Sequence, residues 1–182
     1  MSLSGSQPTP LTGPAFAGHY PALTHDTSLS PETRLWIYTA SRPLTVAEAE
    51  VAQLQLENFV RSWTAHNQAL RAQAELFDNQ FLILAVDESR AGASGCSIDK
   101  SVHFLEQLGE QLGLDWFGRM RFGWLNTEGQ LQVADRSEFA ALLQAGAITN
   151  DTLVVNTLVQ KRGDLAAQWL VEFVRSWHRR LF

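Results

Sequence analysis

The sequence predicts an α+β fold: a ferredoxin-like (βαββαβ) core with a C-terminal β-hairpin/helix extension. Runs of β-branched and aromatic residues indicate strands, apolar residues at helical spacing indicate helices, and the two alternate as strand, helix, strand, strand, helix, strand. The composition is that of a globular protein, because the 182 residues are 45% hydrophobic and 18% charged, with a formal net charge of -5. We therefore expect one folded domain with a substantial core.

Residues 1–33 differ in composition from the rest of the chain. Five of the six prolines lie there, together with Ser, Thr and Gly and only two charged side chains. Such a segment buries too little apolar surface to offset the entropy lost on ordering. We expect a disordered or loosely attached tail, followed by a single α+β domain over residues 34–182. Alternatively, Phe16, His19 and Tyr20 form a short docking segment for a partner.

The domain is expected to begin with a strand and a helix. Residues 35–39 are aromatic and β-branched, which predicts the first strand. Thr45 with Glu48 three residues later is a capping-box signature, so a helix should begin there and run to about His66. Its buried face is predicted to consist of Leu56, Phe59, Val60 and Trp63.

A β-hairpin is predicted next. Residues 75–77 and 81–86 are separated by Asp78-Asn79, a pair that tolerates positive φ. The second run is apolar without alternation, which is typical of a strand covered on both faces.

A loop from Asp87 to about Cys96 leads into a second predicted helix. Gly113 is expected to be its C-cap. The helix should bury one apolar stripe, made of Ile98, Val102, Leu105, Leu108 and Leu112.

The remaining segments predict further short elements. Residues 120–125 and 131–133 should pair as strands across a turn at 126–129, and Ser137 should cap a short helix that ends near Ala145.

The C-terminal extension is predicted to contain a strand and a last helix. Residues 153–155 and 158–159 are β-branched and apolar. The helix should begin near Asp164 and bury four residues at four-residue steps, namely Leu165, Trp169, Phe173 and Trp177.

The segment from 87 to 101 is the candidate functional site, because its polar residues join the most buried strand to the start of a helix. Helix N-termini carry unsatisfied N–H groups and a partial positive charge. We expect a small anionic ligand or a protein partner to bind there. The predicted binding residues are Asp87, Glu88, Ser94, Gly95, Ser97 and Lys100.

A thiol-dependent enzyme is the alternative function. Cys96 would be the nucleophile, because a helix N-terminus lowers a thiol pKa. Asp99 and His103 would orient and deprotonate it, although both fall on the side of the helix away from the apolar stripe. His66 and His178 are further candidate bases that only folding could bring close.

Several functions are disfavoured by the sequence. Lys100-Ser101 resembles the end of a Walker A motif, but Asp99 and Ser94 stand where the motif needs glycine, so we expect no functional ATPase. No cofactor is expected. One cysteine and scattered histidines argue against a metal site, and the acidic charge argues against nucleic acid. No apolar run could cross a membrane, so we expect a soluble, cytoplasmic chain, with a homodimer as an open alternative.

Four strings of residues are similar to a known family. They are LWIYTASRPLT at 35–45, FLILAVDES at 81–89, ASGCSIDKSVHFL at 93–105 and SWHRR at 176–180. They resemble an uncharacterised bacterial family, frequent in Bacteroidetes, whose members are often labelled "ABC transporter ATPase". The resemblance covers the chain from about residue 34 onward. It implies no established activity or catalytic residue, and its label conflicts with the missing phosphate loop.

Overall fold

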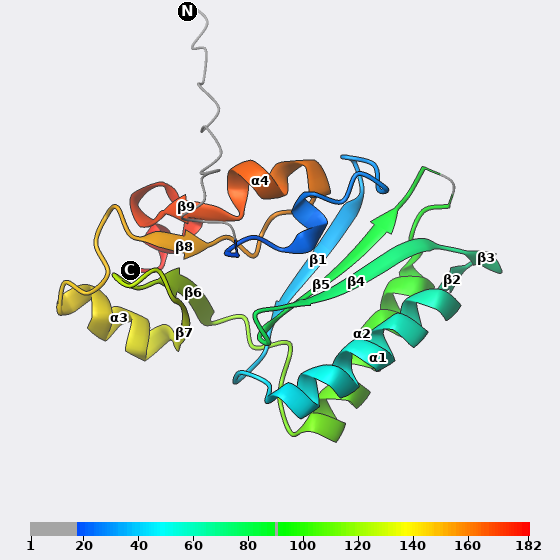
Figure 1. The fold of residues 1–182 in the computed structure, drawn as a ribbon, viewed down its shortest axis with the longest axis horizontal. Helices are drawn as coiled ribbons and strands as arrows, with labels where there is room; N and C mark the ends of the chain where they lie inside the picture. The colour runs from blue at the N-terminus through cyan, green and yellow to red at the C-terminus, as the bar shows by residue number, and fades with distance from the viewer. Residues whose placement is uncertain (1–17, 90) are drawn as a thin grey trace, which may run out of the picture.

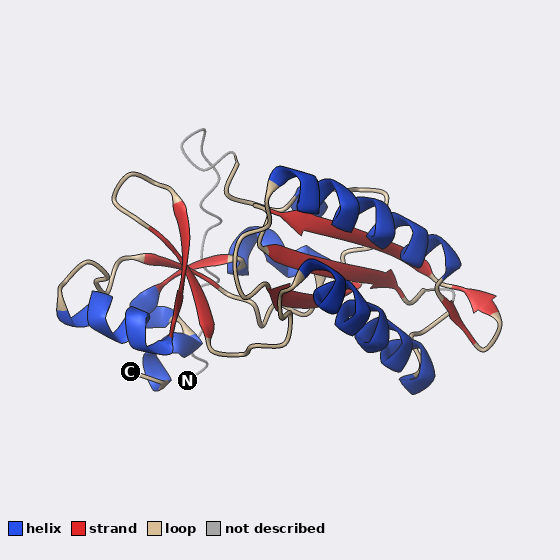
Figure 2. Cartoon of the chain, turned by 90° about the horizontal axis from the view of Figure 1, so that it is seen from below, coloured by secondary structure: helices blue, strands red, loops and turns tan. Residues whose placement is uncertain are grey.

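A three-stranded antiparallel sheet and two long helices form the first lobe, residues 34–112. The structure is a computed structural model that describes residues 18–89 and 91–182. The strands lie in the order β1-β5-β4. The elements of this lobe are β1 (Arg34–Thr39), α1 (Val46–Ser62), β4 (Arg71–Phe77), β5 (Phe81–Asp87) and α2 (Gly95–Leu112). Both helices cover the same face of the sheet, as Figures 1 and 2 show.

The local signals that predicted this lobe are confirmed. The backbone N–H of Glu48 donates to Oγ1 of Thr45, and the N–H of Thr45 donates to the Glu48 carboxylate, so the capping box is complete. Asp78 and Asn79 both have positive φ in the β4–β5 turn. Gly113 ends α2 with a φ of 63°, a conformation that favours glycine.

Strand β5 is the centre of the molecule and is buried on both faces. Leu82, Leu84 and Val86 face α1 and α2, whereas alternate residues, among them Phe81 and Ile83, face the second lobe. All seven of its residues are buried. The apolar run without alternation is therefore confirmed as a strand covered on both sides.

Helix α1 ends at Ser62 rather than near His66, because the chain turns there into a small hairpin. The hairpin consists of β2 (Thr64–Ala65) and β3 (Gln68–Ala69). Its turn residues His66 and Asn67 have φ values of 48° and 63°. A backbone with positive φ cannot continue a right-handed helix.

The predicted apolar stripe of α2 is partly wrong. Leu105 and Leu108 are buried as expected, but Ser97 and Ser101 replace Ile98 and Val102 as the buried residues of the first turns. The hydroxyls of these serines donate to carbonyls one turn earlier, at 2.8 and 2.6 Å. Because their polar groups are satisfied locally, the two small side chains can face the core.

The second lobe, residues 121–182, is a four-stranded antiparallel sheet in the order β7-β6-β8-β9 with one regular helix beside it. Its elements are β6 (Arg121–Leu125), β7 (Leu131–Asp135), α3 (Arg136–Gln144), β8 (Leu153–Val155), α4 (Leu165–Gln168) and β9 (Leu170–Glu172). The hairpin of β6 and β7 is confirmed. Helix α3 is capped by Asp135 and not by Ser137, because the Asp135 carboxylate accepts two N–H groups of the first turn.

The ferredoxin-like arrangement is not confirmed, although the α+β class is. A ferredoxin-like sheet would place the strand after α2 beside β1, whereas β6 pairs with β7 and β8 in the second sheet. Residues 160–162 approach the outer edge of β1 instead. There the N–H of Leu35 donates to the carbonyl of Gln160 at 2.8 Å.

The long C-terminal helix is also wrong. Only Leu165–Gln168 is α-helical, and the chain then forms β9 and two 3₁₀ turns. Leu165, Trp169 and Phe173 are nevertheless buried as predicted, whereas Trp177 is only partly buried. The four-residue spacing therefore identified buried positions, but these residues belong to a helical turn, a strand and a 3₁₀ turn rather than to one helix. Residues 158–159 likewise form no strand, although Val159 is buried.

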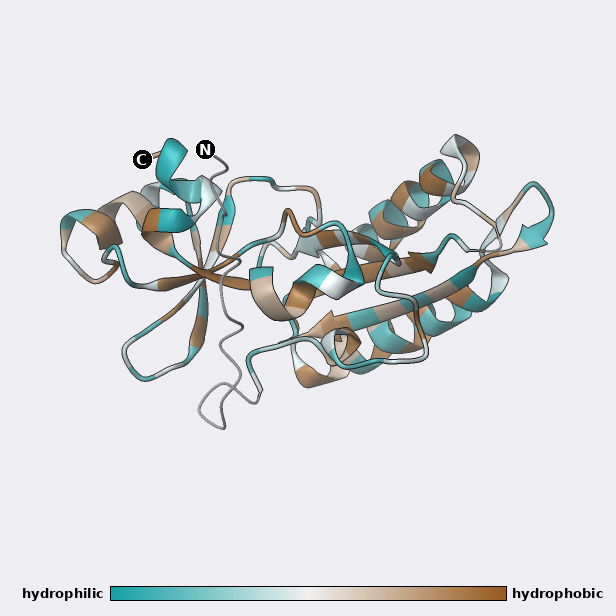
Figure 3. Ribbon diagram, turned by 90° about the horizontal axis from the view of Figure 1, so that it is seen from above, coloured by the Kyte–Doolittle hydropathy of each residue, from teal (hydrophilic) through white to brown (hydrophobic). Residues whose placement is uncertain are grey.

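A shared core joins the two lobes. Trp169 packs edge-to-face on Phe77 and Phe81, with ring centroids 5.7 Å apart in each pair. Figure 3 shows hydrophobic residues gathered on the strands where the lobes meet. None of the helices in the described part of the chain has the length and apolarity needed to span a bilayer.

The predicted N-terminal tail lies partly outside the described residues, because residues 1–17 are not among them. Residues 18–33 contact the shared core, where Leu23 and Leu29 are buried. The carboxylate of Glu75 in β4 accepts the N–H groups of Ala22 and Leu23 at 2.6 and 2.9 Å.

Candidate functional site

The candidate segment joins the end of β5 to the start of α2. Strand β5 ends at Asp87, Ser94 is the N-cap of α2, and Gly95 is its first residue. Arg90, within the connecting loop, lies outside the described residues. The segment thus has the strand–loop–helix geometry that the sequence predicts.

Asp87 is a buried carboxylate that contacts Ser89 and Arg71. It is only 3% exposed, it accepts the N–H of Ser89 at 3.0 Å, and Arg71 lies 3.2 Å away. Hydrogen bonds from the side chain and backbone of Ser89, assisted by the charge of Arg71, lower the pKa of Asp87. Asp87 therefore stays ionised at neutral pH.

Glu88 links the loop to strand β1. Its carboxylate accepts the N–H of Ala93 at 3.0 Å and lies 3.7 Å from the Arg34 guanidinium. Arg34 is also stacked over the ring of Trp36, with its central carbon 4.6 Å from the ring centroid.

Backbone groups at the start of α2 already have hydrogen-bond partners within the protein. The Ser94 hydroxyl accepts the N–H of Ser97, so the cap satisfies one of the free donors of the first turn. The Trp63 indole donates to the carbonyl of Ser97 at 2.8 Å. Gly95 and Lys100 are exposed to solvent.

The groups of the thiol hypothesis are not joined by hydrogen bonds in the part of the chain that the structure describes. Cys96 is exposed and free, and no hydrogen bond connects it to a histidine or carboxylate among the described residues. Asp99 is exposed, and His103 bonds Glu106 at 3.0 Å on the solvent side of α2. His178 is buried in the second lobe, against Phe122 and Phe139.

A groove of about 790 Å³ lies at the end of β1 and β5 that faces residues 160–161. It is lined by Ser30, Glu32, Arg34, Leu35, Trp36, Asp87, Glu88, Ser89, Gln160 and Lys161. We call this the strand-end groove. It includes Asp87 and Glu88 of the predicted binding residues, whereas Ser94, Gly95, Ser97 and Lys100 do not line it.

The strand-end groove holds charges of both signs and one aromatic wall. Lys161 contacts Glu32 at 2.6 Å, and both side chains are more than half exposed. Arg34 contacts Glu88 on the other side, beside the ring of Trp36. The groove can thus offer cations, carboxylates and an aromatic surface within one space.

Sequence reasoning missed most of the groove's lining. Glu32 falls in the predicted tail and Arg34 precedes a strand, so neither had a chemical signature of its own. Lys161 comes close to Arg34 only because the two residues form a β-bridge across more than a hundred positions. No local pattern could have revealed that contact.

The described residues contain no group of three or more His, Cys, Asp or Glu side chains that could hold a metal ion.

Comparison with protein-family models, with curated proteins and with solved structures yields no match. The resemblance to the bacterial family labelled "ABC transporter ATPase" therefore stays a prediction.

Proposed function

We propose that the chain is a binding domain whose strand-end groove takes a small zwitterionic molecule, such as a free amino acid. The observation that carries this proposal is the set of opposite charges along one groove of about 790 Å³, with Trp36 as its wall. Ligand sites of this size commonly combine apolar surface with a few placed polar groups.

The anionic end of the ligand is assigned to Arg34 and Lys161. Their side chains are 45% and 53% exposed, and within residues 18–89 and 91–182 each forms one ion pair, with a glutamate. Exposed ion pairs contribute roughly 0–1 kcal/mol, so a ligand carboxylate can replace a glutamate at little cost. The fork of Arg34 suits two-point binding of a carboxylate.

The cationic end is assigned to the carboxylate side of the groove. Glu32 and Glu88 are 73% and 36% exposed, whereas the charge of buried Asp87 is already paired with Arg71. A simple anion would face the two exposed carboxylates, whereas an ammonium group would be attracted by them. We therefore favour a zwitterion over the plain anion that the helix N-terminus alone would take.

A thiol-dependent reaction at Cys96 has less support. Exposure makes the thiol accessible, but a nucleophile also needs a base within hydrogen-bond reach. Among the described residues, no hydrogen bond joins Cys96 to a histidine or a carboxylate. The binding proposal therefore includes no chemical step.

Titration of the full chain with glycine, glutamate or lysine, followed by amide NMR, tests the proposal. We expect shifts at Arg34, Trp36 and Lys161 with amino acids, and smaller effects with acetate or inorganic phosphate. Arg34→Ala and Lys161→Ala should each weaken binding by roughly ten- to a hundredfold, since a charged hydrogen bond contributes roughly 1.5–3 kcal/mol.

Lys100→Ala is the matched control, because it removes one exposed positive charge outside the groove. It should leave amino-acid binding unchanged. Phosphate binding that disappears in Lys100→Ala, with no shift at Trp36, would place the site at the α2 N-terminus and overturn the groove proposal.

A further inference from the structure

A groove of about 670 Å³ lies where the start of β6, the end of β7 and the first turn of α3 meet. It is lined by Gly118, Arg119, Met120, Arg121, Asp135, Arg136, Ser137 and Ala140. We call it the arginine groove, because three of its eight lining residues are arginines. The chain as a whole is acidic, with 14 Lys and Arg against 19 Asp and Glu. The groove therefore gathers the charge that is in the minority in this sequence.

The charge of the arginine groove is only partly neutralised. Asp135, its single acidic lining residue, accepts the N–H groups of Ser137 and Glu138 and so caps α3. Arg119 and Arg136 have no ion-pair partner in the part of the chain that the structure describes. An anionic partner can therefore pair with these two cations without first displacing a carboxylate.

Arg121, the third cation of the groove, is held in place before any ligand binds. Its side chain is 25% exposed, and its guanidinium lies 3.5 Å from the Asp115 carboxylate. A Cβ at Gly118 would overlap this guanidinium, so the glycine lets Arg121 lie against the backbone. A side chain that is already ordered loses less entropy when a ligand binds.

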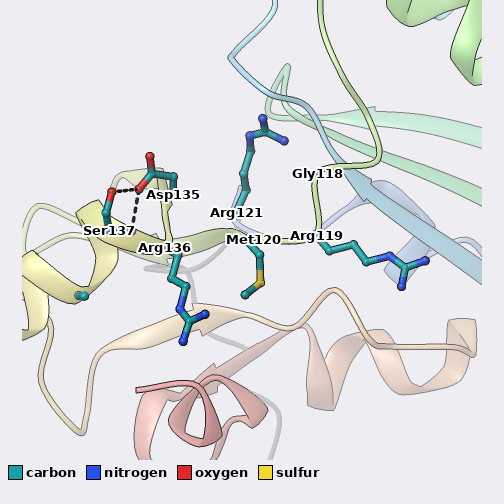
Figure 4. Close-up of a pocket in the computed structure, with 8 residues that line it drawn as sticks. Gly118, Arg119, Met120, Arg121, Asp135, Arg136 and Ser137 are labelled. Atoms are coloured by element: carbon teal, nitrogen blue, oxygen red, sulfur yellow. Dashed lines mark hydrogen bonds between the residues drawn. The ribbon is translucent and has the colours of Figure 1, made fainter.

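Residues 118–120 add free backbone groups and an apolar side chain to the groove. They form an irregular segment before β6, and their N–H and C=O groups make no hydrogen bond with another described residue. Met120 is 41% exposed. Figure 4 shows Arg119 and Arg136 extending to opposite sides of Met120, and Arg121 extending in a third direction. An extended peptide can pair with such free backbone groups, as a strand does when it adds to a sheet edge.

We propose that the arginine groove binds an extended acidic peptide of a partner protein, in which an apolar residue lies between acidic ones. The apolar residue contacts Met120, and the flanking carboxylates pair with Arg119 and Arg136. Cations that point apart fit separated carboxylates better than one small anion, which needs donors that converge. The eight lining residues include no aromatic ring on which a base could stack, which favours a peptide over a nucleic acid. Residues 1–17 contain no Asp or Glu, so the chain's own N-terminal residues do not supply this peptide.

Amide NMR titration of the full chain with the peptide Glu-Ser-Glu-Leu-Glu-Ser-Glu, blocked at both ends, tests the proposal. The blocked ends leave no terminal ammonium group for the strand-end groove. We expect shifts at residues 118–121 and 136–140, and weaker binding at high salt, because salt screens exposed charge pairs. The same peptide with Gln in place of Glu should bind about tenfold more weakly, since it loses both charge pairs.

Arg119→Glu should weaken binding of the acidic peptide about tenfold, because it replaces an attraction with a repulsion. Arg61→Glu is the matched control: it makes the same change of charge at a 69% exposed side chain on α1, outside the groove. It should bind the peptide like the wild type. The amide spectra of both variants also show that they remain folded.

A double-mutant cycle tests the apolar contact separately. Met120→Ala and the replacement of the central leucine of the peptide by serine should each weaken binding. Together they should weaken it less than the product of the two single effects, because both remove the same contact. Independent effects of the two changes would show that the leucine does not lie on Met120.

Four results would overturn the proposal. They are equal binding of the Gln peptide, an equal loss in Arg61→Glu, tighter binding of polyphosphate or an oligonucleotide at the same residues, and self-association of the wild type that Arg119→Glu abolishes. The first two would mean that the arginines do not select the ligand. The third would assign the groove to a phosphate chain, and the fourth to a second copy of this chain.

Discussion

The two lobes are stabilised in different ways. The first lobe has helices of 17 and 18 residues that are capped by Thr45 and Ser94, over a core that is mainly aliphatic. The second lobe has strands of three to five residues, one short regular helix and several tight turns around a cluster of aromatic rings. Long capped helices form largely through local interactions, whereas short elements depend on packing between distant residues. The second lobe should therefore respond more strongly to the loss of one large side chain.

Trp169→Ala should produce the largest effect. Trp169 is fully buried, and its rings contact Phe77 and Phe81 of the first lobe. Its indole N–H also donates to the carbonyl of His19 at 2.9 Å. Removing a buried tryptophan typically costs about 3–5 kcal/mol of the free energy of unfolding. Urea denaturation measures this loss.

Trp36→Ala is the comparison for Trp169→Ala, because Trp36 is only partly buried in β1. Trp36→Ala should lower the free energy of unfolding clearly less than Trp169→Ala does. Equal losses in the two variants would show that the contact between lobes does not contribute more than an ordinary partly exposed ring.

Acid should destabilise the second lobe through His178. Burial disfavours the charged imidazole and lowers the pKa of His178 to about 4 from 6.5. The unfolded chain therefore binds this proton first. Stability is complete above pH 6.5 and decreases as pH falls toward 4, with a total loss of about 3 kcal/mol.

His178→Phe removes this titration while keeping a ring in the cluster. The difference in unfolding free energy between the wild type and the variant, measured from pH 7 to 4, isolates the histidine from the carboxylates. A difference that does not change with pH would contradict the buried, neutral state of His178.

The smallest losses of stability are expected at the helix N-caps, because each lobe has a helix that begins with a capping box. Thr45 caps α1 and Asp135 caps α3, each in a capping box. Thr45→Ala and Asp135→Ala should each cost about 1 kcal/mol, as is usual for an N-cap. Thermal unfolding compares them, and Ser137→Ala, which removes only the hydroxyl that donates to the Asp135 carboxylate at 2.7 Å, should cost less than Asp135→Ala. A cost several times greater at Asp135 would mean that α3 organises the second lobe.

Much of the first lobe could be predicted because its signals are local. Thr45 and Glu48 lie three residues apart, and Asp78 and Asn79 are adjacent. The residues that produce the helix cap and the turn are therefore close together in the sequence. The unbroken apolar run of β5 also indicated burial on both faces. These features depend on neighbours along the chain rather than on the final packing.

The second lobe and the groove could not be predicted in the same way. The sequence between Leu165 and Trp177 shows where rings are buried but not that the chain changes from helix to strand at Leu170. The strand-end groove depends on a bridge between Arg34 and Lys161, which only the assembled fold creates. Of its charged residues, only Asp87 and Glu88 stood in a recognisable pattern.

The position of β5 has a consequence for dividing the chain. A fragment that stopped at Leu112 would keep α1 and α2 but would leave Phe81, Ile83 and Ala85 facing water. Three apolar side chains exposed together on one face of a sheet favour aggregation. The two lobes are distinct in Figure 1, but a fragment that ends at their boundary should not be stable in solution.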